Sequence, residues 1–438
     1  MALIHEAIAL HQAGDLDAAE QQYQAILASE PDHPDALHLL GLINYARGEY
    51  EQAVVMVQKA IGLAPGNSVY SFNLGNIYRD QGNLQAAETA YLDAISVEPD
   101  NAEYCYVLAD ILDSNGQGAR AVEYYQRAIE LAPDDAGIYL DLGACYQGQN
   151  QIDAAVSQYQ AALAIDPTLA PAHNNLGGIF HALGDMEKAG SCYRDAIESD
   201  PELAEAHRNY AAVLEIQGDT ESALHHYREA LRINPDYGEV AFKIAALSGD
   251  EAPAVAPSEY VAGLFDQYAE EFDKHLTGTL GYRTPVLLRE MFDRLAAESG
   301  QVRILDLGCG TGLSGEAFRD RASYLAGVDL SSRMIDKATE RNIYDELHCG
   351  DVVDALRRTP SDWDLLLAVD VLVYIGDLGD FMQAATSALK PGGSLLFSVE
   401  KSTQSGFVLG KSGRYAHNMD YLEGLAAKAG LVVTGAEE

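Results

Sequence analysis

Hydrophobic and polar positions follow two different patterns along this chain of 438 residues. In residues 1–248, apolar residues recur every three or four positions over successive short stretches, which is typical of amphipathic helices. From residue 302, short apolar runs alternate with helical patterns, which indicates a parallel sheet covered by helices on both faces. The pattern therefore predicts a multidomain protein with an all-α part first and an α/β part second along the chain.

The helical part repeats with a period of 34 residues, marked by Pro31, Pro65, Pro99, Pro133, Pro167, Pro201 and Pro235. Alanine recurs in the same register from Ala19 to Ala223, and a tyrosine follows it four residues later in six of the seven copies. Small residues let two helices approach closely, tyrosine fills the space between them, and proline ends the pair. Since one pair cannot bury its apolar face alone, we expect the pairs to stack into a solenoid, with these tyrosines in its core.

This spacing resembles the tetratricopeptide repeat over residues 1–248, as seven units followed by a capping helix within 236–249. The resemblance implies a concave groove, lined by the first helix of each unit, that binds a protein or peptide. Asn73, Asn175 and Asn209 share one groove position and are candidates for holding the backbone of an extended peptide. Ordinary solvated polarity of a groove is the alternative interpretation.

Proline and small residues in 249–257 predict a linker, and a second domain is expected over 258–438. It opens with a predicted helix over 259–276 and a second from Pro285 to Ala297. The expected strands are 302–307, 323–329, 344–348, 363–369, 394–400 and 431–436, and the expected helices lie near 312–320, 332–341, 377–389 and 418–429. Ligands of such sheets bind at the carboxyl ends of the strands.

The first strand runs into a glycine-rich loop with the sequence LDLGCGTG. Its glycines do not match the G-x-G-x-x-G spacing of dinucleotide-binding loops. Asp329 ends the second strand, where a carboxylate can accept hydrogen bonds from both hydroxyls of a ribose. Asp351 follows the third strand, where it can face an adenine. These features indicate a nucleoside site, and the ribose feature alone does not separate nicotinamide dinucleotides from other nucleosides.

Together with LKPGG before the fifth strand, these motifs resemble the class I S-adenosylmethionine-dependent methyltransferases, which have a Rossmann-like fold. The resemblance implies S-adenosylmethionine as the cofactor, a ligand without phosphate. The first strand and the glycine loop would approach its methionine part, and the later residues its ribose and adenine. The implied cofactor-site residues are Asp306, Gly308, Gly310, Gly312, Asp329, Leu330, Met334, Asp351 and Val352.

The repeats and the segment FDQYAEEFDKHL add a resemblance to a bacterial group of repeat-containing methyltransferases. Tyr268 and the helix around it are candidates for a lid over the cofactor. Asp370 ends the fourth strand, where it lines the methionine pocket or caps the strand. Asp370, Tyr374 and His417 are the candidate acceptor-site residues, with His417 as a base because its pKa lies near physiological pH. Packing is the alternative role for Tyr374, and solvent exposure for His417.

Sheets of this class normally have seven strands. The last expected strand, 431–436, corresponds to the sixth, so we expect the seventh strand to be missing and the domain to be incomplete at its C-terminal end. A continuous seven-stranded sheet would contradict this expectation.

Charge narrows the list of partners. The net charge is −39, of which residues 1–257 contribute −28 (11 basic and 39 acidic residues) and residues 258–438 contribute −11 (17 and 28). Such a surface repels nucleic-acid phosphates and favours a basic partner, if any. We expect no signal peptide and no membrane span, and the five scattered cysteines indicate a reducing compartment, the cytoplasm, without a metal site.

The sequence thus favours an S-adenosylmethionine-dependent methyltransferase whose repeats recruit a protein or peptide-like substrate or partner. Two alternatives stay open. One is a non-catalytic scaffold that binds the cofactor without turnover, and the other is a nicotinamide-dependent oxidoreductase.

Overall fold

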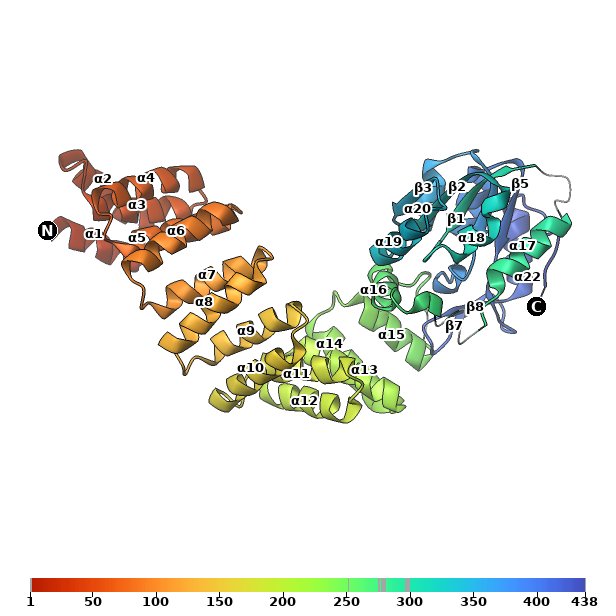
Figure 1. Ribbon diagram of the computed structural model, residues 1–438, viewed down its shortest axis with the longest axis horizontal. Coiled ribbons are helices and arrows are strands. Elements are labelled where there is room, and N and C mark those ends of the chain that lie inside the picture. The colour runs from red at the N-terminus through yellow and green to blue at the C-terminus, as the bar shows by residue number, and fades with distance from the viewer. Residues whose placement is uncertain (1, 251, 275, 277–280, 296–299, 438) are drawn as a thin grey trace. The chain divides into compact units, whose positions relative to one another are not determined.

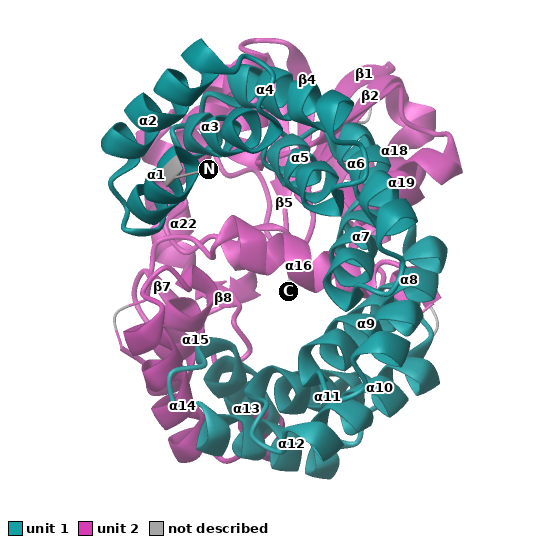
Figure 2. Cartoon of the chain, turned by 90° about the vertical axis from the view of Figure 1, so that its left-hand side faces the viewer, with its two compact units in different colours: residues 1–213 teal, residues 214–438 magenta. Residues whose placement is uncertain are grey.

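A computed structural model of the chain describes residues 2–250, 252–274, 276, 281–295 and 300–437 (Figure 1). The chain divides into two compact units, residues 1–213 and 214–438 (Figure 2). The first unit is helical, and the second contains the last repeat helices and a parallel-sheet α/β domain. The predicted fold class, an all-α solenoid preceding an α/β domain, is therefore confirmed.

The repeat helices form antiparallel pairs in the predicted register. The first helices of the pairs are α1 (Ala2–Gln12), α3 (Pro34–Ala46), α5 (Ser68–Asp80), α7 (Ala102–Ser114), α9 (Ala136–Gly148), α11 (Ala170–Ala182) and α13 (Ala204–Gln217). The second helices are α2 (Leu16–Ser29), α4 (Tyr50–Leu63), α6 (Leu84–Val97), α8 (Gly118–Leu131), α10 (Ile152–Ile165), α12 (Met186–Ser199) and α14 (Thr220–Ile233), and α15 (Gly238–Ser248) packs on α14 as the expected capping helix.

The repeat tyrosines are core residues, as predicted, and the glycines of the repeat make room for their rings. Tyr91 is fully buried, and a Cβ atom built on Gly75 would lie only 2.5 Å from the Tyr91 ring. The same close approach recurs between Gly143 and Tyr159, at 2.6 Å. The glycine of one helix and the tyrosine of the next therefore set the distance between the two helices of a pair.

This contact predicts that Gly75→Val is destabilising. The larger side chain would overlap the Tyr91 ring, and such overpacking typically costs about 1–3 kcal/mol of unfolding free energy. Urea unfolding followed by helical circular dichroism would measure the loss. Gly66→Val is the matched control, because a Cβ at Gly66 meets nothing within 4 Å. Equal stability of the two variants would contradict the role given to this contact.

The second unit is built on a five-stranded parallel sheet with the strand order β3-β2-β1-β4-β5. Its strands are β1 (Val302–Leu307), β2 (Ala322–Asp329), β3 (Glu346–Cys349), β4 (Trp363–Ala368) and β5 (Leu389–Phe397). The chain winds outward from β1 to β3 and then returns to β4 on the other side of β1. The carboxyl ends of β1 and β4 therefore form the switch point where sheets of this kind bind ligands.

Helices cover both faces of this sheet. Alternate residues of each strand point to opposite faces, so neighbouring residues of one strand pack in different cores. Ile304 and Leu365 pack in one core with α17 and α18, whereas Leu305 and Leu366 pack in another with α20, α21 and α22. The helices of the unit are α16 (Ser258–Tyr268), α17 (Thr284–Leu295), α18 (Leu313–Phe318), α19 (Ser332–Arg341), α20 (Val352–Arg358), α21 (Gly379–Ala388) and α22 (Met419–Lys428), with short 3-10 turns at Arg319–Arg321 and Leu372–Tyr374. The expected end of the second helix at Ala297 lies outside the described residues.

The C-terminal part differs from the prediction. The expected strand over 431–436 is wrong, because these residues have no regular structure and Val432 is 84% exposed. β-branched residues favour a strand only when a neighbouring strand offers pairing and burial. Residues 400–417, where no strand is predicted beyond 400, instead form a small sheet of β6 (Glu400–Lys401), β7 (Phe407–Leu409) and β8 (Tyr415–His417). Within the described residues the main sheet has five strands, where six were expected.

Candidate functional site

The glycine loop between β1 and α18 needs its glycines. Gly308, Gly310 and Gly312 have φ angles of +68°, +52° and +99°, in the left-handed region that favours glycine. A Cβ on Gly308 would lie 2.7 Å from Val371, which follows β4. The amide of Gly308 donates to the carbonyl of Val328 on β2 at 2.8 Å. The loop is thus folded tightly across the ends of β1, β2 and β4.

Asp329 at the end of β2 joins two loops. One of its carboxylate oxygens accepts the amide of Gly310 at 2.9 Å, and the other accepts the amide of Ser331 at 2.9 Å. The side chain is 8% exposed, and burial raises its pKa. Each carboxylate oxygen can accept a further hydrogen bond, because a carboxylate has about four acceptor positions. The structure therefore brings the predicted ribose carboxylate and the glycine loop into direct contact.

Asp306 at the end of β1 lies beneath the loop. It is fully buried, and its Oδ2 accepts the hydroxyl of Tyr344 at 2.7 Å. Its Oδ1 has no well-formed hydrogen bond among the described residues. Burial, with a smaller contribution from the charge of Asp329, raises the pKa of Asp306 to about 7. Tyr344 was not a predicted site residue, because nothing in its local sequence marks a contact with a strand 38 residues away.

The residues expected around the adenine lie at the ends of β2 and β3. Met334 and Val352 are buried in the structure, and Leu330 packs against an aromatic cluster that contains Tyr374. The carboxylate of Asp351 accepts the amides of Val353 and Asp354 at 2.8 and 3.0 Å and so caps α20, a helix that the sequence analysis missed. Contact of these residues with an adenine stays a prediction.

The predicted lid lies against the glycine loop. It comprises α16 and the turn that follows, residues 258–274, which we call the overlying segment. The ring of Phe272 comes within 3.8 Å of the Cβ position of Gly310, and Tyr268 packs edge-on against Phe272 with their ring centroids 5.7 Å apart. Tyr268 therefore reaches the loop through Phe272.

Asp370 stands two residues after the end of β4 and has an unusual backbone. Its φ angle is +56°, which is uncommon for a residue with a side chain and marks local strain. Ser398 holds this conformation, because its Oγ accepts the Asp370 amide and donates to the carboxylate, both at 2.8 Å. Burial and a hydrogen bond to Asp370 raise the pKa of Tyr282 far above its usual range, so that Tyr282 donates to this carboxylate. Tyr282 was not a predicted site residue, because nothing in its local sequence marks a contact with Asp370.

Tyr374 lies in the 3-10 turn after β4. Its ring meets Phe265 of the overlying segment edge-on, with centroids 5.6 Å apart. Its carbonyl accepts the amide of Ala256 at 2.9 Å, and the amides of Gly376 and Asp377 both donate to the carbonyl of Ala254 at 2.8 Å. The predicted linker thus forms a short antiparallel bridge with the loop after β4.

His417 is buried rather than exposed. It lies in β8 with 1% of its surface exposed, so solvent exposure, the alternative expected for it, is wrong. Its Nε2 lies 2.9 Å from the carbonyl of Ile375 and 3.1 Å from that of Gly376, so Nε2 carries a proton. Burial lowers the pKa of His417, which keeps the ring neutral. His417 therefore supports the loop after β4, and its role as a base stays a prediction.

Comparison with known proteins agrees with this geometry. Residues 305–395 match the methyltransferase domain family. Tetratricopeptide repeat families match residues 5–68, 72–136, 124–157, 148–184 and 168–236. The chain carries tetratricopeptide repeats and a methyltransferase domain.

Curated relatives of the methyltransferase domain include the tRNA 5-carboxymethoxyuridine methyltransferase of Escherichia coli K12, which is 32% identical over 145 residues, covering 30% of this chain and 55% of that protein. The ubiquinone biosynthesis O-methyltransferase of Idiomarina loihiensis is 29% identical over 112 residues, covering 25% and 46%. The chain thus spans about half the length of these relatives. The crystal structure of the C-terminal part of a repeat-containing protein from Cytophaga hutchinsonii matches with 17% identity and a TM-score of 0.47, covering 54% of this chain and 98% of that one.

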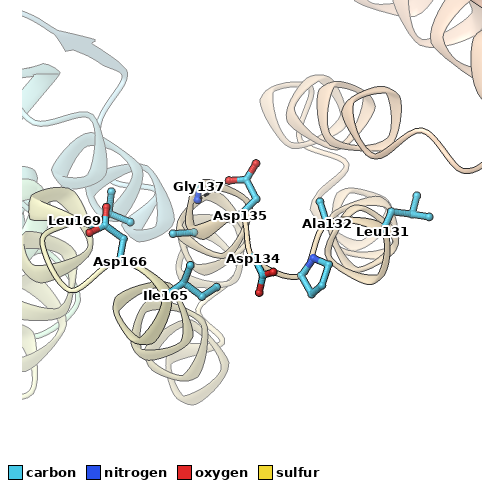
Figure 3. Close-up of a pocket in the computed structure, with 10 residues that line it drawn as sticks. Leu131, Ala132, Asp134, Asp135, Gly137, Ile165, Asp166 and Leu169 are labelled. Carbon is cyan, nitrogen blue, oxygen red and sulfur yellow. Dashed lines mark hydrogen bonds between the residues drawn. The ribbon is translucent and has the colours of Figure 1, made fainter.

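In the repeat domain, the three groove asparagines contact neighbouring side chains. The Nδ2 of Asn73 lies 3.0 Å from Nε2 of His38, that of Asn175 donates to the Tyr159 hydroxyl at 3.4 Å, and that of Asn209 donates to Oδ1 of Asn174 at 3.0 Å. These bonds orient the amides, and contact with a peptide stays a prediction. A separate surface depression lies at the turns between repeats and contains none of these asparagines (Figure 3); Leu131–Gly137, Ile165, Asp166 and Leu169 line it.

In the part of the chain that the structure describes, no three His, Cys, Asp or Glu side chains come together as a group that could hold a metal ion. In the same part, no helix combines the length and the apolar character that crossing a membrane requires.

The raised pKa of Asp306 makes stability depend on pH. In the unfolded chain this carboxyl ionises near pH 3.9, and in the folded protein near pH 7. Between these values the folded state keeps a proton that the unfolded state has released, so the free energy of unfolding falls as the pH rises from about 4 to about 7. Asp306→Asn has no carboxyl group at this position, so its free energy of unfolding lacks this dependence on pH. We expect the variant to be only slightly more stable than the wild type near pH 4 and about 2–4 kcal/mol more stable above pH ~7.

Fluorescence of Trp363, the single tryptophan of the chain, would report this unfolding, because Trp363 lies buried in β4 of the same sheet. Asp336→Asn at an exposed position of α19 serves as the control. A stability difference between Asp306→Asn and the wild type that does not change with pH would contradict the prediction.

Proposed function

We propose that this protein is an S-adenosylmethionine-dependent methyltransferase whose repeat domain recruits a protein or peptide-like substrate or partner. The observation that carries the proposal is the carboxylate of Asp329, which holds Gly310 and Ser331 together at the switch point of a methyltransferase domain. Ribose hydroxyls are suitable donors for the remaining acceptor positions of this carboxylate.

The residues present fit S-adenosylmethionine chemically. Three glycines with left-handed backbones form the loop, and a Cβ atom at Gly308 would overlap Val371. Carboxylates stand at the ends of three neighbouring strands, Asp306, Asp329 and Asp370. Negative charge there favours a ligand with a sulfonium and an ammonium group over a ligand with phosphates. We propose that Asp329 binds the ribose and that Leu330, Met334, Asp351 and Val352 surround the adenine.

When bound, the cofactor supplies a methyl group on a sulfonium with a good leaving group. The protein must then align the acceptor with this methyl group, exclude water and remove a proton where the acceptor carries one. We propose that the overlying segment, through Tyr268 and Phe272, excludes water. Asp370 and Tyr374 line the acceptor side of β4, and Asp370 is placed to take a proton because Tyr282 and Ser398 fix its carboxylate.

The repeat domain supports the recruitment part of the proposal. Residues 1–257 carry a net charge of −28, from 11 basic and 39 acidic residues, so a partner with basic segments is favoured and RNA is not. We therefore do not propose a tRNA, the substrate named for the Escherichia coli relative, as the substrate of this protein. All five cysteines are free thiols, which supports a reducing compartment, and we place the protein in the cytoplasm.

Cofactor identity can be tested by titration calorimetry with S-adenosylmethionine, its demethylated product and NAD. We expect the first two to bind and Asp329→Ala to weaken both at least about tenfold, because two hydrogen bonds to a carboxylate are lost. Asp380→Ala is the control, since that side chain is 82% exposed and stands in α21. Binding of NAD in place of S-adenosylmethionine would instead support the nicotinamide alternative.

Recruitment can be tested by incubating the protein with cell extract and a labelled methyl donor. We expect a labelled protein product, and we expect the triple variant Asn73→Ala, Asn175→Ala, Asn209→Ala to lose this labelling while keeping its affinity for S-adenosylmethionine. Labelling that survives the triple variant would contradict the groove assignment. Cofactor binding without labelling of any molecule would favour the non-catalytic scaffold.

A further inference from the structure

The overlying segment presents three carboxylates on one side. Asp266 lies in α16, and Glu270 and Asp273 lie in the residues that follow it. They face the basic residues of α19. Glu270 pairs with Lys337 at 3.1 Å, and Asp273 pairs with Arg341. The carboxylate of Asp266 accepts the backbone amide of Arg333 at 3.4 Å, and its backbone carbonyl accepts the Arg333 guanidinium at 3.4 Å.

Two of these carboxylates also reach the loops of the cofactor site. Asp266 accepts the hydroxyl of Ser331 at 2.5 Å, and Ser331 is the residue whose amide binds Asp329. Asp273 accepts the hydroxyl of Thr311, which stands between Gly310 and Gly312. Glu270 differs from both, because in the described structure it has no hydrogen bond to either loop.

Arg341 strengthens the second of these contacts. Its Nε donates to the carbonyl of Thr311 at 2.6 Å, and its guanidinium also binds Asp273 and Glu316. Thr311 is therefore held by its carbonyl and by its hydroxyl at the same time. Since the aromatic ring of Phe272 next to Asp273 lies on Gly310, the bond to Thr311 also fixes that ring over the loop.

We propose that Asp266 and Asp273 are positioning residues that fasten the overlying segment to the two cofactor loops, so that cofactor binding and closure of the segment are coupled. The proposal rests on the proposed function. Asp266 holds the loop that follows Asp329, and Asp273 holds the glycine loop. A bound cofactor keeps both loops in the geometry that the two carboxylates recognise, and the fastened segment in turn slows the release of the cofactor.

Hydrogen bonds to a carboxylate are stronger than those between neutral groups, and a typical loss is about tenfold or more in affinity when one is removed. We therefore expect Asp273→Asn and Asp266→Asn each to weaken the binding of S-adenosylmethionine about tenfold in calorimetry and to speed its dissociation. Glu270→Gln is the matched control, because it removes an ion pair between the same two elements without touching a loop. We expect it to change the affinity less than about twofold.

Two measurements separate positioning from a general loss of structure. The first is Thr311→Val, which removes the donor of one bond and keeps every charge. The loss of affinity for S-adenosylmethionine in a Thr311→Val, Asp273→Asn double variant should be smaller than the sum of the two single losses, because both substitutions break the same hydrogen bond. The second is salt dependence. Raising the salt from about 0.05 M to about 0.5 M shortens the screening length and weakens charged contacts. Glu270→Gln keeps the carboxylates of Asp266 and Asp273, whereas the Asp266→Asn, Asp273→Asn double variant has lost them. The affinity of Glu270→Gln for S-adenosylmethionine should therefore fall more steeply with salt than that of the double variant.

The outcomes are distinct. A wild-type protein that does not bind S-adenosylmethionine would overturn the proposed function. A wild-type protein that binds it, with Asp266→Asn, Asp273→Asn and Thr311→Val all within about twofold of Glu270→Gln, would overturn the positioning role alone. Unfolding followed by Trp363 fluorescence identifies any variant that loses its structure. If an aspartate variant does so, the affinity of Thr311→Val for S-adenosylmethionine still tests the positioning role, because this variant keeps every charge.

Discussion

The organisation of the second unit depends on one buried carboxylate. Asp329 accepts backbone amides from Gly310 and Ser331, so a single side chain fixes the loop after β1 relative to the loop after β2. Burial makes its negative charge costly unless these donors are in place. The glycines follow from the same constraint, because the loop passes through three left-handed backbone positions as it brings the Gly310 amide to the carboxylate.

Much of this arrangement could be predicted because it is periodic or local. The 34-residue register determines the helix pairs, and the buried Tyr91 opposite Gly75 shows why the register cannot slip. Strands β1 to β5 follow short apolar runs, and Asp329 lies where the alternation of strands and helices predicts a ligand edge. The expectation that Asp329 and the glycine loop lie at one edge needed only the rule that ligands bind at the carboxyl ends of parallel strands.

The rest could not be predicted, because it depends on contacts between distant parts of the chain. Tyr344 reaches Asp306 across 38 residues, and Asp266 reaches Ser331 across 65. No local pattern distinguishes these side chains from ordinary surface residues. Residues 431–436 show the opposite error, since their β-branched sequence favours a strand and the described structure offers them none to pair with. His417 shows a third, because burial in β8 changed the chemistry expected of a loop histidine.

The backbone bridge between residues 254–256 and the loop after β4 has an evolutionary consequence. Repeat arrays are readily gained and lost by recombination when a flexible tether joins them to their neighbours. Here the tether supplies the carbonyl that pairs the amides of Gly376 and Asp377, and it accepts the hydroxyl of Tyr415 at Pro253. A gene fusion that exchanged the array together with its tether would leave those amides unpaired in the loop after β4. Residues 253–256 are therefore expected to be inherited together with the methyltransferase domain.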